Sequence, residues 1–144
     1  MCGCAQTPDG EELATRTRPL ILIVEDDHVV RDLLSSTLQE AGLGVVTAEM
    51  AQYALAAVEA NHPDLIVLDL GMPRGTMQGM DFLALLRDTE RWKNLPVLIL
   101  SGWGDIVNRD VTARLGVGAV LSKPMADIPS LVRTIRAHLP PSQG

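Results

Sequence analysis

Three acidic side chains follow two apolar runs at the points where those runs end. The first run, 20–24, is followed at once by Glu25 and Asp26, and the second, 65–68, is followed by Asp69. Short runs so rich in Ile, Leu and Val are typical of buried parallel strands. In open parallel sheets, ligands bind just beyond the carboxyl ends of the strands. The sequence therefore predicts three negative charges at one edge of a sheet, which a bound cation would stabilise.

Two further polar residues stand in similar places. Ser101 ends the apolar run 96–100, and Lys123 follows the run 117–121 by two residues. Together with the carboxylates they form a set suited to phosphoryl transfer. A hard divalent ion such as Mg²⁺ binds carboxylate oxygens, and Asp69 is then placed to attack a phosphoryl group. Lys123 and the Ser101 hydroxyl would stabilise the charge on the transferring oxygens.

Alternating strands and helices are needed to bring these residues together. We expect strands at about 20–25, 44–48, 64–69, 96–100 and 117–121, and helices at about 28–41, 50–60, 80–90, 105–115 and 127–139. Asp27 is a suitable N-cap for the first helix, and Gly42 ends it. Five strands alternating with five helices predict a doubly wound α/β domain, with a parallel sheet and helices on both of its faces.

The apolar residues of two predicted helices recur at helical spacing. Leu33 and Leu34 belong to this pattern in the helix at 28–41. Phe82, Leu85 and Leu86 form a similar face in the helix at 80–90. Apolar residues at this spacing lie on one face of a helix.

Length, charge and composition narrow the class of protein. The chain has 144 residues, which fits one domain, and its net charge of −6 argues against a nucleic-acid-binding surface. We interpret 1–18 as a flexible leader, 19–139 as the domain and 140–144 as a tail. Both cysteines lie in the leader, too near the end to cross-link a fold. Without a signal peptide or an apolar run of membrane length, the expected compartment is the cytoplasm.

Four motifs carry a resemblance to a known family. They are IVEDD at 23–27, LDLGMP at 68–73, LSG at 100–102 and SKP at 122–124. In this order, and at the ends of predicted strands, they resemble the receiver domains of two-component response regulators over about 19–139. The resemblance implies the receiver or flavodoxin-like fold, a five-stranded parallel sheet with strand order 2-1-3-4-5.

The resemblance also implies roles for the acidic residues. Asp69 would be the phosphoacceptor, taking its phosphoryl group from a histidine kinase or a phosphotransfer protein. Asp26 would bind Mg²⁺ directly and Glu25 through a water molecule. Asp69 and the main-chain carbonyl of Gly71 would supply further ligands.

Ser101 and Lys123 complete the implied site, as the hydroxyl switch residue and the partner of the phosphoryl group. Two features depart from the family pattern. Val120 stands where receivers usually carry Tyr or Phe, whose ring moves with the hydroxyl residue. The loop segment 74–79 is about two residues longer than is common. Val120 leaves a second interpretation open, a pseudo-receiver that has kept the fold and lost regulated phosphorylation.

Other functions fit the residues less well. Phosphatases of the haloacid dehalogenase type need a second acid two residues after the nucleophile, where this chain has Gly71. We therefore expect a signalling domain rather than an enzyme. The expected form is a stand-alone receiver that signals by protein–protein contact to a downstream target, without contacting nucleic acid or membrane. A homodimer and a fragment of a larger regulator are left open.

Overall fold

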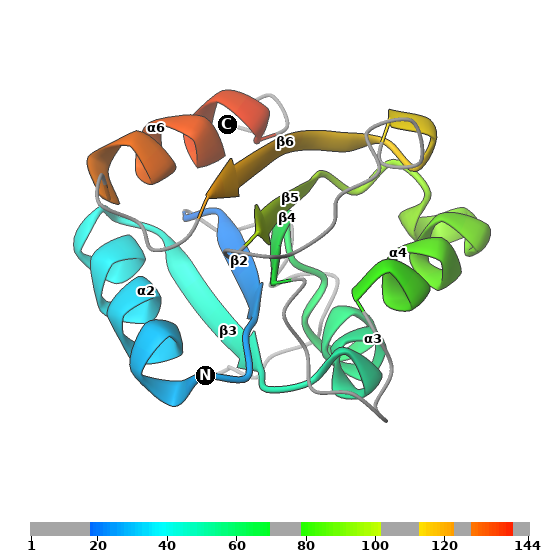
Figure 1. Ribbon diagram of the computed structural model, residues 1–144, viewed down its shortest axis with the longest axis horizontal. Helices are drawn as coiled ribbons and strands as arrows, with labels where there is room; N and C mark the ends of the chain where they lie inside the picture. Colours follow the sequence, from blue (N-terminus) through cyan, green and yellow to red (C-terminus); the bar gives the residue numbers. More distant parts are fainter. Residues whose placement is uncertain (1–17, 70–78, 102–112, 123–127, 140–144) are drawn as a thin grey trace, which may run out of the picture.

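The computed structural model describes residues 18–69, 79–101, 113–122 and 128–139, and five strands form one parallel sheet there (Figure 1). The strands are β2 (Leu20–Val24), β3 (Gly44–Ala48), β4 (Leu65–Asp69), β5 (Val97–Ser101) and β6 (Val117–Ser122). Their order across the sheet is β3-β2-β4-β5-β6, and every neighbouring pair is parallel. Counted along the chain, this is the order 2-1-3-4-5 that the family resemblance implies.

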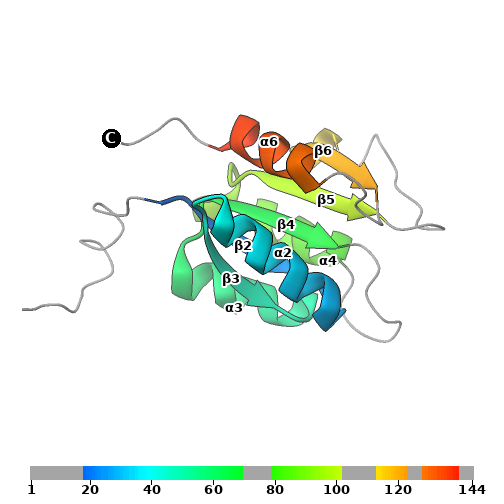
Figure 2. The ribbon, with the colours of Figure 1, turned by 90° about the vertical axis from the view of Figure 1, so that its left-hand side faces the viewer.

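Helices cover both faces of the sheet. They are α2 (His28–Glu40), α3 (Ala51–Asn61), α4 (Gly79–Asp88) and α6 (Ile128–His138), and the short 3-10 helix η1 (Glu90–Trp92) follows α4. Figures 1 and 2 show α2 and α6 on one face and α3 and α4 on the other. Ile21 and Ile23 pack toward α2 and α6, whereas Leu22 and Val24 pack toward α3 and α4. Because both faces are covered, the strands are continuously apolar.

The predicted ends of the first helix are confirmed. The carboxylate of Asp27 accepts hydrogen bonds from the main-chain N–H groups of Val29 and Val30, at 2.9 and 3.4 Å. These groups have no acceptor within the first helical turn, so the side chain replaces the missing partner. Gly42 follows the helix with a φ of 90°, a conformation that residues with a side chain rarely adopt.

Two residues of the apolar helix faces are exposed. Leu33 is 51% exposed and Leu85 is 44% exposed. The buried residues are Leu34 and Leu38 on α2, and Phe82, Leu83 and Leu86 on α4. A helix buries only the part of its apolar face that meets the sheet, so apolar residues beside that part stay exposed to solvent.

Several predictions fall outside the described residues. They concern nearly all of the leader at 1–18, most of the helix at 105–115, and the tail at 140–144. The limits of the domain at 19 and 139 therefore stay predictions. None of the helices in the described ranges is long and apolar enough to cross a membrane.

A bulge in β6 changes which of its residues face the core. Val97 pairs with Val117, but the next residue, Leu98, pairs with Ala119, so Gly118 is the extra residue. Val117 and Val120 consequently pack on the side of α3 and α4, three positions apart. A Cβ atom at position 118 would lie only 2.6 Å from the ring of His138, so glycine also leaves room for α6.

Arg87 joins α4 to the start of β6. Its guanidinium donates hydrogen bonds to the carbonyls of Leu115, Gly116 and Trp92, at 2.6, 3.2 and 3.0 Å. Partial burial lowers the pKa of Arg87 from its ordinary value, because the charged form loses contact with water. The three carbonyls accept hydrogen bonds only, so the charged guanidinium is a matching donor for all of them.

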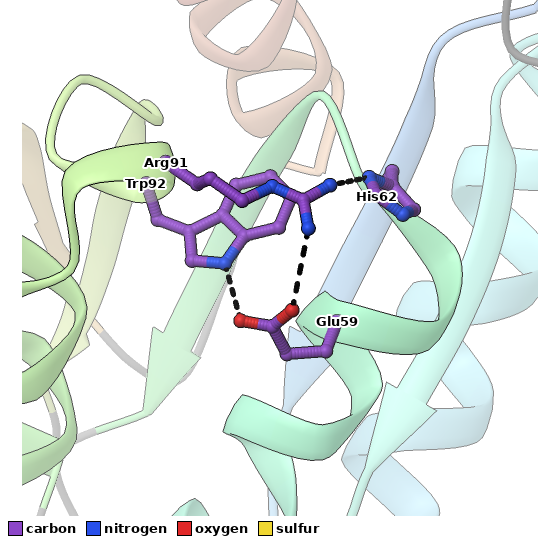
Figure 3. A network of polar contacts seen from close by, with 4 residues as sticks. All are labelled: Glu59, His62, Arg91 and Trp92. Atoms are coloured by element: carbon purple, nitrogen blue, oxygen red, sulfur yellow. Dashed lines mark hydrogen bonds and ion pairs between the residues drawn. The ribbon is translucent and has the colours of Figure 1, made fainter. Parts of the chain in front are cut away.

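A polar network connects the end of α3 to η1 (Figure 3). The indole N–H of Trp92 donates to Glu59 at 2.8 Å, and the guanidinium of Arg91 lies over the Trp92 ring, 4.8 Å from its centroid. Arg91 also approaches Glu59 at 3.7 Å and the Nδ1 atom of His62 at 3.2 Å. Trp92 is buried, whereas the Arg91–Glu59 ion pair is about half exposed. The buried indole of Trp92 therefore contributes more to stability here than the Arg91–Glu59 ion pair does, since exposed ion pairs stabilise little.

The first prediction compares two substitutions in this network. Trp92→Phe should lower the free energy of unfolding by about 1–2 kcal/mol, because it removes a buried hydrogen bond and part of the packed ring. Arg91→Ala should cost less than about 1 kcal/mol, since its contacts are half exposed. Urea unfolding followed by circular dichroism measures both values. An Arg91→Ala variant that loses as much stability as Trp92→Phe would contradict this ranking.

Candidate metal centre

The register of the sheet places two of the predicted acidic residues beside each other. Val24 is paired with Leu68 in the parallel strands β2 and β4. The residues that follow these partners are Glu25 and Asp69, so both leave their strands at the same level of the carboxyl edge. The main-chain N–H of Glu25 also donates to the carbonyl of Ala48 at 3.1 Å, which joins this point to β3.

Glu25, Asp26 and Asp69 form one cluster. Each offers one carboxylate oxygen, and the three oxygens all lie within 4.8 Å of one another. Glu25 and Asp69 are buried, at 0% and 1% exposure, whereas Asp26 is exposed. When both are ionised, two buried charges at this separation repel by about 3 kcal/mol at an effective dielectric constant of about 20. When ionised, the cluster therefore destabilises the folded protein locally, and a bound cation would reduce this repulsion.

Hydrogen bonds hold Glu25 and Asp27 in the corner between β2 and α2. The Glu25 carboxylate accepts from the N–H of Asp27 at 3.2 Å, and Asp27 in turn caps α2. Arg31, in the first turn of α2, donates from Nη1 to the main-chain carbonyl of Glu25 at 2.9 Å. Sequence reasoning missed Arg31. The available signal was a cation on the first turn of the helix that follows Glu25 and Asp26.

The donor set of this cluster fits a hard divalent cation. Mg²⁺ prefers carboxylate oxygens, binds them at 2.0–2.1 Å and keeps several waters. Three oxygens within 4.8 Å of one another can meet this need, either directly or through a water. The exposed side chain of Asp26 leaves the cluster open to the solvent. Glu25, Asp26 and Asp69 are the residues that would hold the ion.

The remaining predicted site residues are described in part or not at all. Ser101 is the last residue of β5, where it pairs with Ser122 of β6. Its side chain lies outside the described part of the chain, as do Gly71 and Lys123, so the roles of these three residues stay predictions. Val120 is described, and it is half-buried against the core on the side of α3 and α4.

The fold and the site together define a doubly wound α/β domain with an acidic cation site at the carboxyl edge of its sheet. A family model described as the response regulator receiver domain matches residues 21–136, well over half of the chain. The chain belongs to this family. Receivers are signalling domains of two-component systems, and they bind Mg²⁺ at an acidic pocket.

Curated relatives and solved structures agree with this assignment. Regulator of RpoS from Escherichia coli K12 is 38% identical over 88% of this chain, and the KDP operon transcriptional regulatory protein KdpE from the same strain is 36% identical over 72%. The chain spans 37% and 44% of the lengths of these two relatives. The chemotaxis response regulator CheY4 of Vibrio cholerae matches with a TM-score of 0.75 and 30% identity, covering 85% of this chain and 100% of that one.

The second prediction tests the cluster with neighbouring, matched substitutions. Asp26→Asn should raise the free energy of unfolding in EDTA by up to about 1 kcal/mol, because it removes one of three crowded charges. It should also abolish most of the stabilisation that excess Mg²⁺ gives the unsubstituted protein through binding linkage. Urea unfolding with EDTA and with Mg²⁺ measures both effects.

Asp27→Asn is the control for this prediction. It makes the same charge change one residue away, and asparagine keeps the oxygen that caps α2. This variant should respond to Mg²⁺ as the unsubstituted protein does. Equal loss of the response in both variants would show that net charge, rather than the three-carboxylate cluster, attracts the ion.

Proposed function

We propose that this chain is a receiver that accepts a phosphoryl group on Asp69 from a histidine kinase or a phosphotransfer protein, in a Mg²⁺-dependent reaction. The observation that supports the proposal is the position of Asp69. It ends a fully buried strand, is itself 1% exposed, and shares a cluster with Glu25 and Asp26. A carboxylate so placed is fixed in direction and stands at the ligand-binding edge of the sheet.

The chemistry assigned to Asp69 is a nucleophilic displacement. One carboxylate oxygen attacks phosphorus, a P–O bond forms, and the bond from phosphorus to the donor nitrogen or oxygen breaks. The donor leaves with that electron pair and takes up a proton. Bound Mg²⁺ would neutralise charge on the phosphoryl oxygens. Glu25 and Asp26 would hold the ion, and the predicted roles of Lys123 and Ser101 are to bind the phosphoryl oxygens.

Val120 favours the alternative function, a pseudo-receiver that binds partners without regulated phosphorylation. Its half-buried side chain has no ring that could turn inward on phosphorylation. A receiver with valine here needs another way to transmit the phosphorylated state to its downstream target. Phosphorylation of Asp69 is therefore the property that separates the two functions.

The third prediction tests the phosphoacceptor. With Mg²⁺ and acetyl phosphate, the unsubstituted protein should gain the mass of one phosphoryl group, and Asp69→Asn should gain none, because the amide is a poor nucleophile. Asp88→Asn, at an exposed carboxylate at the end of α4, is the matched control and should be labelled normally. Intact-mass spectrometry reads the result. Failure of the unsubstituted protein to be labelled by acetyl phosphate or by any histidine kinase of its source would favour the pseudo-receiver.

A protein phosphodonor has to cover the edge from which α2 begins. Val29 and Leu33, one helical turn apart on α2, are 63% and 51% exposed, so this helix presents an apolar pair beside the acidic cluster. Exposed apolar side chains that lie together are typical of contact surfaces. We assign this pair to the phosphodonor protein, because α2 begins two residues after Asp26, so its first turns lie next to the acidic cluster along the chain.

The fourth prediction separates docking from chemistry. Leu33→Asp should slow transfer from a phosphorylated kinase or phosphotransfer protein by about tenfold or more, since a charge would enter an apolar contact. Labelling by acetyl phosphate, which needs no protein contact, should be unchanged. Leu85→Asp makes the same change at an exposed leucine on the opposite face of the sheet and should leave both rates unchanged. If Leu33→Asp slowed transfer from the protein donor and from acetyl phosphate equally, the defect would lie in the phosphorylation site itself.

A further inference from the structure

The hydrogen bond between Arg31 and Glu25 links α2 to the peptide unit that carries the acidic pair. Arg31 Nη1 donates to the Glu25 main-chain oxygen at 2.9 Å, and the main-chain N–H of Arg31 donates to the Asp27 carbonyl at the same distance. Arg31 therefore contacts both ends of the corner 25–27, once through its side chain and once through its backbone.

The carbonyl that Arg31 binds has a particular place in the chain. It belongs to the peptide that joins Glu25 to Asp26, and the orientation of this rigid plane, together with the φ angle of Asp26, sets the direction in which the Asp26 side chain leaves the backbone. Asp26 is the exposed member of the cluster, so little packing holds it. Its direction depends on its backbone more than the directions of the buried residues Glu25 and Asp69 do.

We infer that Arg31 is a positioning residue for the cation site, which it serves by fixing the Glu25–Asp26 peptide so that the carboxylates converge. This inference rests on the metal role proposed above. Partners that orient metal ligands commonly change metal affinity by about 10- to 100-fold when they are removed. Arginine suits the task because its planar guanidinium stays charged and loses little freedom for each hydrogen bond it forms.

The direction in which Mg²⁺ affinity changes when Arg31 is neutralised tests the inference. A positive charge so near the cluster repels a second cation, so charge alone would make Arg31 weaken Mg²⁺ binding. Neutralising Arg31 would then tighten binding. If Arg31 positions the carboxylates, the same substitution weakens binding instead. The two effects therefore predict opposite changes in the dissociation constant for Mg²⁺.

The structure provides a matched control at the other end of the same helix. Arg136 of α6 donates from Nη2 to the main-chain carbonyl of Ala41, the C-cap of α2. Arg136→Gln thus removes the same charge and the same kind of hydrogen bond, at the end of α2 far from the acidic cluster. Arg136→Gln therefore measures the effect of losing one charge and one hydrogen bond on α2 when the Glu25–Asp26 peptide is not involved.

The fifth prediction is measured by calorimetric titration of the full chain with Mg²⁺, with no phosphodonor present. Arg31→Gln should raise the dissociation constant about tenfold. Arg31→Lys, which keeps the charge and can form one hydrogen bond from a more flexible chain, should raise it less. Arg136→Gln should leave it unchanged. Urea midpoints in EDTA, taken for every variant, detect a purely structural role, which would lower the midpoint and leave the affinity unchanged.

Each of the following results would overturn the inference. A lower dissociation constant in Arg31→Gln would show that Arg31 acts on the ion only through its charge. An unchanged dissociation constant would show that Arg31 does not affect Mg²⁺ binding. Equal weakening in Arg136→Gln would show a general effect of α2. Absence of Mg²⁺ binding in the unsubstituted protein would overturn the proposed metal role, and the inference with it. If Arg31→Gln does not fold, Arg31→Lys decides the matter, because a raised dissociation constant at unchanged charge supports positioning and an unchanged one overturns it.

Discussion

Repulsion between carboxylates at the carboxyl edge of the sheet is the constraint on which the site depends. The parallel register of β2 and β4 brings Glu25 and Asp69 to the same level, and both are buried there. The buried apolar strands that carry these residues help to offset this repulsion. Every residue from Ile21 to Val24 and from Leu65 to Leu68 is buried. The sheet is therefore stable enough to hold a charge arrangement that is unfavourable by itself.

The carboxylates are held in two different ways. Asp69 is part of a strand with a neighbour on each side, β2 and β5, so its backbone has little freedom. Glu25 and Asp26 lie in a corner where hydrogen bonds run from Asp27 to Glu25 and from Arg31 to the Glu25 carbonyl. The strand gives the proposed phosphoacceptor Asp69 a fixed direction, and the hydrogen bonds of the corner direct the proposed metal ligands Glu25 and Asp26.

Local patterns predicted the elements well and their contacts poorly. Apolar runs located the strands, and the acidic residues after them located the cluster, because strand ends and caps are short-range features. Alternation of strands and helices could not choose the strand order, which came from the family resemblance. The spacing of Leu33 and Leu85 could not show that they are exposed, because the part of an apolar face that is buried depends on the partner surface. The contacts of Arg87 with Leu115 and of Trp92 with Glu59 join residues 28 and 33 positions apart, which no local pattern contains.

The bulge at Gly118 has a consequence for how this protein behaves at high concentration. β6 is an edge strand of the described sheet, and an open edge is a template on which strands of other molecules can assemble. The extra residue breaks the even spacing of donors and acceptors along that edge. A strand from a second molecule could match the ladder on one side of Gly118 but not on both. The same glycine that admits α6 thus protects the protein against aggregation through β6.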